Sequence, residues 1–130
     1  MVHTTTLEEE ILAQVKIDMD YWSQGDTVSY GKSAADDVTF FNNSPAGARI
    51  DGVKAFRELL ASWKGLIPQH EYKIVDPNLQ VYGDIGIFTM HYHAFLPDNV
   101  LLKARGTCVY RKAGDSWELV HEHFSNFEEA

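Results

Sequence analysis

The sequence predicts a single α+β domain in which three N-terminal helices pack on a curved, mostly antiparallel sheet. Along most of the first half of the chain, apolar residues recur at steps of three and four, the period of an amphipathic helix. From about residue 70 onward the pattern changes to alternation, and short turn sequences divide it into strand-length segments. Helices segregated from an antiparallel sheet define the α+β class. We expect residues 1–130 to form one domain.

Composition and charge fit this class and narrow the range of partners. The 130 residues are 45% hydrophobic and 12% aromatic, which suffices for one well-filled core. A formal net charge of −8 makes a nucleic acid or an anionic membrane an unfavourable partner. The single Cys108 cannot form an internal disulfide, and neither a secretory signal nor a membrane-length apolar run is visible. We therefore expect a cytoplasmic protein.

Two helices are expected before the first strand. The first covers about residues 7–23, because a threonine followed three residues later by a glutamate forms a capping box and Gly25 provides a stop. Asp26 is expected to cap a second, shorter helix over about residues 27–35. The helical pattern of this second segment is weaker because Gly31 lies inside it.

A short hairpin and a third helix follow. Residues 38–42 form the expected strand, residues 43–47 have turn composition, and residues 48–50 would be the short return strand. Asp51 is expected to cap a helix whose apolar positions, between residues 53 and 63, are again three and four apart.

The second half of the chain is predicted to be a meander of four strands. Residues 72–82 are interrupted by Asp76-Pro77, so they form an edge strand or a bulged one. The next two strands are expected over residues 85–96 and 100–111. Residues 116–125 are rich in aromatic and β-branched side chains, which favours an interior strand for this last segment.

The order and spacing of these elements carry a family resemblance. The residues concerned are Trp22 with Gly25-Asp26, Asp36-Asp37-Val38-Thr39-Phe40, Asp51-Gly52 with Phe56, Asn78 with Gly83-Asp84, and the closing segment 117–125. Together they resemble the nuclear transport factor two-like superfamily. Within it they are similar to the SnoaL-like polyketide cyclase relatives and to the association domain of calcium/calmodulin-dependent protein kinase II. The resemblance implies a cone with a pocket at its open end. It also implies a homodimer or a larger ring built through the outer face of the sheet.

The known catalytic and binding residues of this superfamily do not carry over to this sequence. The aspartate base of the steroid isomerases falls at Asn42, which cannot abstract a proton, and their helix-one tyrosine falls at about Asp18. The three cleft arginines of the kinase association domain fall at His93, Cys108 and Phe124. Neither an enolising isomerase site of that kind nor a permanently cationic cleft is therefore predicted.

The predicted function is the binding of a compact apolar or aromatic ligand with a polar end. The expected pocket residues are Trp22, Tyr30, Phe40, Asn42, Phe56, Trp63, His93, Cys108 and His123, with Asn42 and His93 as polar anchors. The sequence indicates no cofactor, and it leaves open whether the pocket supports catalysis. The alternative is a non-catalytic oligomerisation domain that resembles the kinase association domain.

The strand expected over residues 85–96 is relevant to both the ligand-binding and the oligomerisation prediction, because neither of its faces is a polar, solvent-facing one. We expect Phe88, Met90 and Tyr92 on the outer face of the sheet and His93 toward the pocket. An antiparallel sheet normally leaves one face polar, so an apolar outer face predicts a partner, most simply a second copy of the chain.

The last strand has two possible alignments. With a two-residue turn at Gly114-Asp115, Cys108 would lie opposite His121, and a bulge would reverse this parity. The sequence leaves open which of His121, Glu122, His123 and Phe124 face inward. The His-x-His pairs at 91 and 121 are predicted to be separated by an intervening strand, so no metal site is expected.

Overall fold

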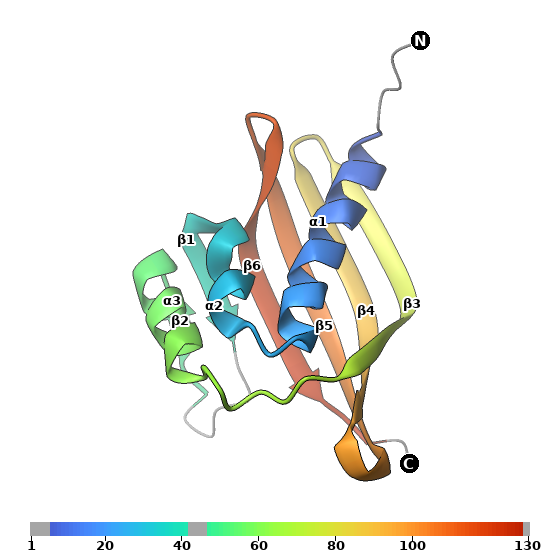
Figure 1. Cartoon of the computed structure of the whole chain (residues 1–130). Helices are drawn as coiled ribbons and strands as arrows, with labels where there is room; N and C mark the ends of the chain where they lie inside the picture. The colour runs from blue at the N-terminus through green and yellow to red at the C-terminus, as the bar shows by residue number, and fades with distance from the viewer. Residues whose placement is uncertain (1–5, 42–46, 129–130) are drawn as a thin grey trace.

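The computed structural model describes residues 6–41 and 47–128, which form three α-helices, two short 3₁₀ turns and six strands (Figure 1). The helical elements are α1 (Leu7–Ser23), α2 (Thr27–Tyr30), η1 (Gly31–Ser33), α3 (Val53–Ser62) and η2 (Pro97–Asn99). The strands are β1 (Ala34–Phe41), β2 (Arg49–Asp51), β3 (Glu71–Tyr82), β4 (Ile85–Leu96), β5 (Val100–Ala113) and β6 (Ser116–Asn126). No helix within these two ranges is both long and apolar enough to cross a bilayer.

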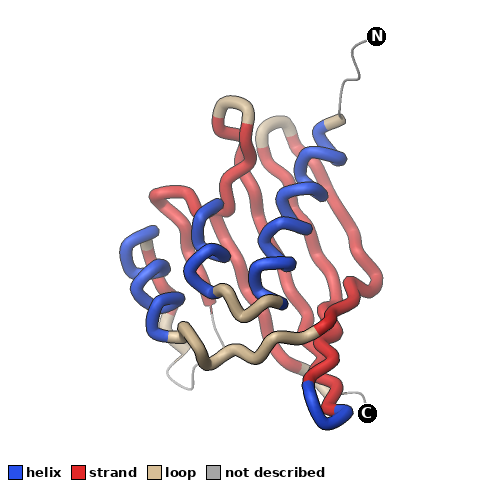
Figure 2. The backbone as a smooth tube through the Cα atoms, viewed as in Figure 1, coloured by secondary structure: helices blue, strands red, loops and turns tan. Residues whose placement is uncertain are grey.

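The six strands form one twisted sheet in the order β2-β1-β6-β5-β4-β3. All neighbours are antiparallel except β1 and β6, which run parallel. The three helices cover one face of this sheet (Figures 1 and 2). The predicted α+β class is confirmed, and so is the interior position of the last strand, which pairs with β1 on one side and β5 on the other.

Helix α1 begins and ends where its sequence predicts. The Thr6 side chain accepts a hydrogen bond from the backbone N–H of Glu9 at 3.1 Å, which satisfies one of the free donors of the first turn. The buried apolar stripe of α1 includes Ile11, whose side chain packs against Gly86 of β4. A Cβ at Gly86 would come within 2.6 Å of the Ile11 side chain, so the glycine lets the helix approach the sheet closely.

The second predicted helix is shorter than expected. It ends at Tyr30, and the chain passes through η1 into β1, which starts at Ala34 instead of residue 38. Gly31 explains this close turn, because a Cβ there would lie 2.7 Å from Leu60 Cδ1 of α3. A buried hydrogen bond from Thr27 Oγ1 to the carbonyl oxygen of Leu60, 2.7 Å long, holds α2 against α3.

The start of α3 differs from its prediction, whereas the interruption of β3 agrees with it. The cap of α3 is Gly52 with φ +89°, and Asp51 instead pairs with Arg49 at 2.6 Å, so the predicted Asp51 cap is wrong. The interruption in β3 is a bulge on the edge strand, as predicted. The pairing register with β4 shifts between Val75 and Asn78, and Asp76 has φ +53°.

Candidate functional site

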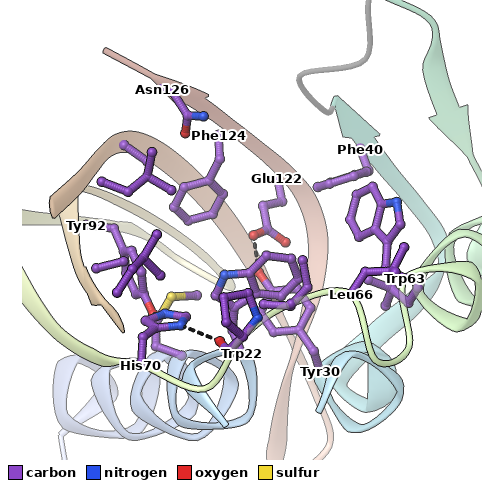
Figure 3. A pocket seen from close by; sticks show the side chains of 18 of the residues that line it. Trp22, Tyr30, Phe40, Trp63, Leu66, His70, Tyr92, Glu122, Phe124 and Asn126 are labelled. Atoms are coloured by element: carbon purple, nitrogen blue, oxygen red, sulfur yellow. Dashed lines mark hydrogen bonds between the residues drawn. The ribbon is translucent and has the colours of Figure 1, made fainter. Parts of the chain in front are cut away.

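A cavity of about 700 Å³ lies between the helices and one end of the sheet (Figure 3). From the helical side and the loop after α3 it is lined by Met19, Trp22, Tyr30, Leu59, Leu60, Trp63, Leu66, Ile67, Pro68 and His70. From the sheet it is lined by Phe40, Phe41, Tyr92, Ala94, Leu96, Leu102, Ala104, Glu122, Phe124 and Asn126. This apolar lining with a few polar groups is typical of small-molecule sites.

The loop after α3 forms part of the cavity wall because it crosses over the end of α1. The backbone N–H of His70 donates to the carbonyl oxygen of Ser23 at 2.8 Å. A Cβ at Gly25 would lie 2.6 Å from the carbonyl oxygen of Ile67, and Gly25 has φ +76°. Both observations require glycine at this position. The crossing brings Leu66 to the cavity (Figure 3).

Four aromatic rings form a continuous wall of the cavity. The Trp22 ring lies 5.3 Å from Tyr30 and 6.1 Å from Trp63, centroid to centroid, and Phe40 lies 6.3 Å from Trp63. The planes of these pairs are tilted by 57°, 74° and 66°. Because the rings are tilted against one another, they present faces as well as edges to the enclosed space.

Glu122 is a buried acid in this wall. It lies in the middle of β6, opposite Cys108 of β5 and Phe40 of β1, and is only 1% exposed. The Tyr30 hydroxyl donates a hydrogen bond to Glu122 Oε1 (Figure 3). Glu122 Oε2 has no hydrogen-bond partner among the described residues. The cavity therefore contains a carboxyl group that is held at one oxygen and unpartnered at the other.

Burial raises the pKa values of Glu122 and Tyr30 and so favours the protonated form of both groups. Loss of water on burial raises the pKa of Glu122, the hydrogen bond from Tyr30 lowers it, and the charge of Asp18 raises it. Together these effects bring the pKa from 4.5 to about 8. Burial also raises the pKa of the Tyr30 phenol well above its ordinary value, so this hydroxyl keeps its proton and remains a donor. At neutral pH most Glu122 is consequently a neutral acid that can donate and accept.

Asp18 of α1 is a second buried acid, but its carboxyl group is fully engaged. It accepts hydrogen bonds from the Tyr110 hydroxyl at 2.8 Å, from the Ser33 hydroxyl at 3.0 Å and from Gln14 Nε2 at 3.0 Å. Burial raises its pKa to about 6 against the effect of these three donors. Asp18 therefore ties α1 to β5 and η1 and supports the site from outside the cavity.

A second polar point is the pair formed by His70 and Tyr92. His70 Nδ1 lies 2.9 Å from the carbonyl oxygen of Pro68, which can only accept, so Nδ1 carries the hydrogen. In the neutral ring Nε2 then accepts from the Tyr92 hydroxyl at 2.7 Å. The Tyr92 ring stacks on Tyr72 with a centroid distance of 5.1 Å, which fixes the orientation of the pair.

The predicted pocket residues fall into four groups, which are lining residues, core residues, Asn42, and the pair His93 and His123 on the opposite side of the sheet. Trp22, Tyr30, Phe40 and Trp63 lie on the cavity lining, and their part in ligand binding stays a prediction. The prediction for Phe56 and Cys108 is wrong. They are 0% and 1% exposed, belong to the core behind the lining, and do not border the cavity. Asn42 lies outside the described residues.

The orientation predicted for β4 is wrong. Phe88, Met90 and Tyr92 are buried in the core under the helices, so they do not form the outer face. His93 consequently points to the outer face, where it lies opposite Lys73 of β3 and Lys103 of β5. His93 is therefore not a polar anchor of the cavity.

A bulge in β6 decides the orientation of the last strand. The register shifts so that Val109 pairs with His121 and Tyr110 with Leu119, which leaves Val120 as the extra residue. Cys108 then faces Glu122. This places Glu122 and Phe124 on the cavity lining.

The same bulge corrects the prediction for His123, which is exposed on the opposite side of β6. His121, on that side as well, makes a 2.7 Å hydrogen bond to Thr39 Oγ1. Strand β5 separates both residues from the histidines of β4. Within the described ranges, no three His, Cys, Asp or Glu side chains are arranged to hold a metal ion.

Comparisons with known proteins agree with this architecture. The family model of the SnoaL-like domain matches residues 18–128. A ketosteroid-isomerase-like protein from Parabacteroides distasonis is 22% identical, with a TM-score of 0.79 and coverage of 97% of this chain and 95% of that one. The CaMKII hub of S. rosetta is 24% identical, with a TM-score of 0.76 and coverage of 97% and 100%.

An NTF2-like protein of unknown function from Pseudomonas putida is 18% identical, with a TM-score of 0.74 and coverage of 97% of this chain and 92% of that one. No curated protein matches the sequence. At these identities the solved structures establish the fold alone, so the function has to be argued from the site.

Proposed function

The chain belongs to the SnoaL-like domain family, and on that basis we propose that it is a small-molecule-binding protein whose cavity holds a compact apolar or aromatic ligand with one polar end. The observation that carries this proposal is the unpartnered carboxyl oxygen of Glu122 on a mostly apolar lining. A buried polar atom without a partner costs about 1–3 kcal/mol. A ligand that supplies this partner recovers that free energy.

In this proposal the Glu122–Tyr30 pair forms the polar end of the site. The sequence assigned this part to His93, which lies on the outer face, and to Asn42, which lies outside the described residues. Tyr30 holds one carboxyl oxygen and the other is buried without a partner, so a ligand group that reaches it would pair with it in a defined orientation. Because the pKa of Glu122 is about 8, the same carboxyl can take up or return a proton near neutral pH. A reaction at the bound ligand would therefore use Glu122.

The first prediction compares two changes at neighbouring positions of β4. Ala94 lines the cavity, so Ala94→Phe places a ring in the ligand space and is expected to weaken binding at least about tenfold. His93→Phe introduces the same ring on the outer face and is expected to leave binding unchanged. Binding is measured with a panel of small aromatic compounds by tryptophan fluorescence, since Trp22 and Trp63 line the cavity. Equal effects of the two changes would contradict the proposed ligand position.

We propose self-association through the outer face of the sheet as a second function, which the orientation of β4 and β5 favours. Ile87 of β4 pairs with Val109 of β5, and both side chains point away from the helices and are half-buried. Phe95 and Leu101, a further cross-strand pair on this side, are each 47% exposed. These apolar pairs support the homodimer predicted from the sequence, on a face that also carries Lys73 and Lys103. The cytoplasmic location likewise stays a prediction.

The second prediction tests this self-association. Val109→Glu places a charge at the centre of the outer face and is expected to convert a dimer into monomers with the fold retained, because the side chain does not enter the core. Analytical ultracentrifugation at micromolar concentration measures the change. Lys73→Glu on the edge strand β3 is the matched control and should leave the dimer intact. A wild-type protein that sediments as a monomer would contradict the proposal.

A further inference from the structure

The charge distribution around Glu122 is one-sided. The ionisable groups that face it are Tyr30 from α2, Asp18 from α1, and Cys108 and Tyr110 from β5. Each of these groups is neutral or anionic, and among the described lining residues there is no lysine or arginine. An ionised Glu122 would therefore have no lysine or arginine as a counter-charge among the described lining residues, and the one histidine there, His70, is hydrogen-bonded to Pro68 and Tyr92.

The aromatic wall surrounds the same carboxyl group. Figure 3 shows Glu122 among Trp22, Tyr30, Phe40 and Trp63, with one oxygen bonded to Tyr30 and the other turned away from it. A cation within about 6 Å of the face of such a ring is attracted by its quadrupole, and the attraction is strongest for tryptophan. Tilted rings around one carboxyl group are the arrangement that recognises amines and quaternary ammonium ions.

We propose that the ligand of this cavity is an organic cation, an amine or quaternary ammonium group on an apolar body, whose head lies among the aromatic rings beside Glu122. This inference rests on the proposed function, because it names the class of ligand held by the same cavity. The unpartnered oxygen Oε2 supplies the negative charge, and the ring faces replace water around the head group. When a quaternary ammonium ion binds, Glu122 releases its proton to solvent, so the charges balance.

The proton release gives cation binding a characteristic pH dependence. With a pKa of about 8 in the free protein, Glu122 must lose its proton before it can pair with the cation, so affinity for a permanent cation rises between pH 6 and pH 9. The rise is expected to be about tenfold or more. A neutral ligand of the same shape should show no such rise, because an ionised Glu122 gives it no favourable contact.

The experiment uses two probes of the same shape, phenyltrimethylammonium and tert-butylbenzene, which differ in charge. Titrations followed by tryptophan fluorescence are made with the wild type and with Glu122→Gln at pH 6 and pH 9. At pH 9 the wild type is expected to bind the cation at least about tenfold more tightly than the isostere. Glu122→Gln should remove this preference and keep the affinity for the isostere within about twofold, because glutamine preserves the shape of the side chain.

A second variant separates the contribution of the rings from that of the carboxyl group. Trp63→Leu keeps an apolar wall but removes a π face. It should therefore weaken binding of the cation more than binding of the isostere, by about threefold or more.

If the wild type binds tert-butylbenzene as tightly as the cation at pH 9, the inference fails while the proposed pocket function stands. If neither probe binds, the inference also fails, and the comparison of Ala94→Phe with His93→Phe on the compound panel decides the pocket function by itself.

Discussion

Replacing Glu122 by Gln is expected to raise the free energy of unfolding by about 3–5 kcal/mol at pH 9 and by about 1 kcal/mol or less at pH 5. Glutamine has the same shape and can still accept the hydrogen bond from the Tyr30 hydroxyl. It removes the buried negative charge that Glu122 acquires in alkaline solution. The gain at high pH is large because the side chain is 1% exposed and has no cationic partner among the described residues around it.

The sign follows from the two protonation states. The pKa of Glu122 in the folded protein, about 8, lies above the ordinary value of 4.5. Its contribution to stability is therefore fully present below pH 4.5 and is lost as the pH rises through 8. Asp18, whose pKa is raised from 3.8 to about 6, acts in the same direction at lower pH and is retained in the variant.

Urea unfolding followed by far-ultraviolet circular dichroism at pH 5, 7 and 9 measures these differences. Glu71→Gln is the matched control, because Glu71 is exposed at the start of β3 and is expected to leave the unfolding curve unchanged. A stabilisation by Glu122→Gln that is equal at pH 5 and pH 9 would contradict the assignment of a buried, proton-binding carboxyl group.

Phe56→Ala is expected to reduce the free energy of unfolding by about 3–5 kcal/mol, because the ring is fully buried and its removal leaves a void that its surroundings fill only in part. Phe56 lies 5.2 Å from the Phe40 ring and is 0% exposed. Phe124→Ala is the comparison: that ring is half-buried on the lining, so its loss enlarges an existing cavity.

The Phe124 change is expected to cost about 1–2 kcal/mol of stability and to weaken ligand binding. The Phe56 change should leave the affinity of the protein that remains folded nearly unaltered. Urea unfolding and the fluorescence titration measure the two quantities on the same samples. Equal losses of stability in both variants would show that the division into core rings and lining rings is wrong.

The helix and strand boundaries were predictable wherever a single period governs the chain. The apolar stripe and capping threonine define α1, and turn residues such as Gly83 and Gly114 delimit the long strands. The boundary between α2 and β1 was not predictable, because it depends on how closely Gly31 approaches Leu60 of α3. That contact joins segments about thirty residues apart, which local patterns do not describe.

The candidate site was predictable only in its aromatic part. Both faces of β4 carry large apolar side chains, so alternation alone could not decide whether Tyr92 or His93 faces the helices. In β6 the inward face depends on the bulge at Val120, which is set by pairing with β5. A glutamate in a strand is usually solvent-facing, and the buried Glu122 accepts its hydrogen bond from a hydroxyl 92 positions away in the sequence.

The most direct test of the proposed site is a ¹³C NMR titration of the Glu122 side-chain carboxyl, assigned by its absence in Glu122→Gln. We expect a midpoint near pH 8 in the free protein and a shift of that midpoint to lower pH when phenyltrimethylammonium is added. A midpoint near the ordinary value of 4.5 that does not change when the probe is added would contradict the claim that Glu122 is a buried, ligand-binding carboxyl group.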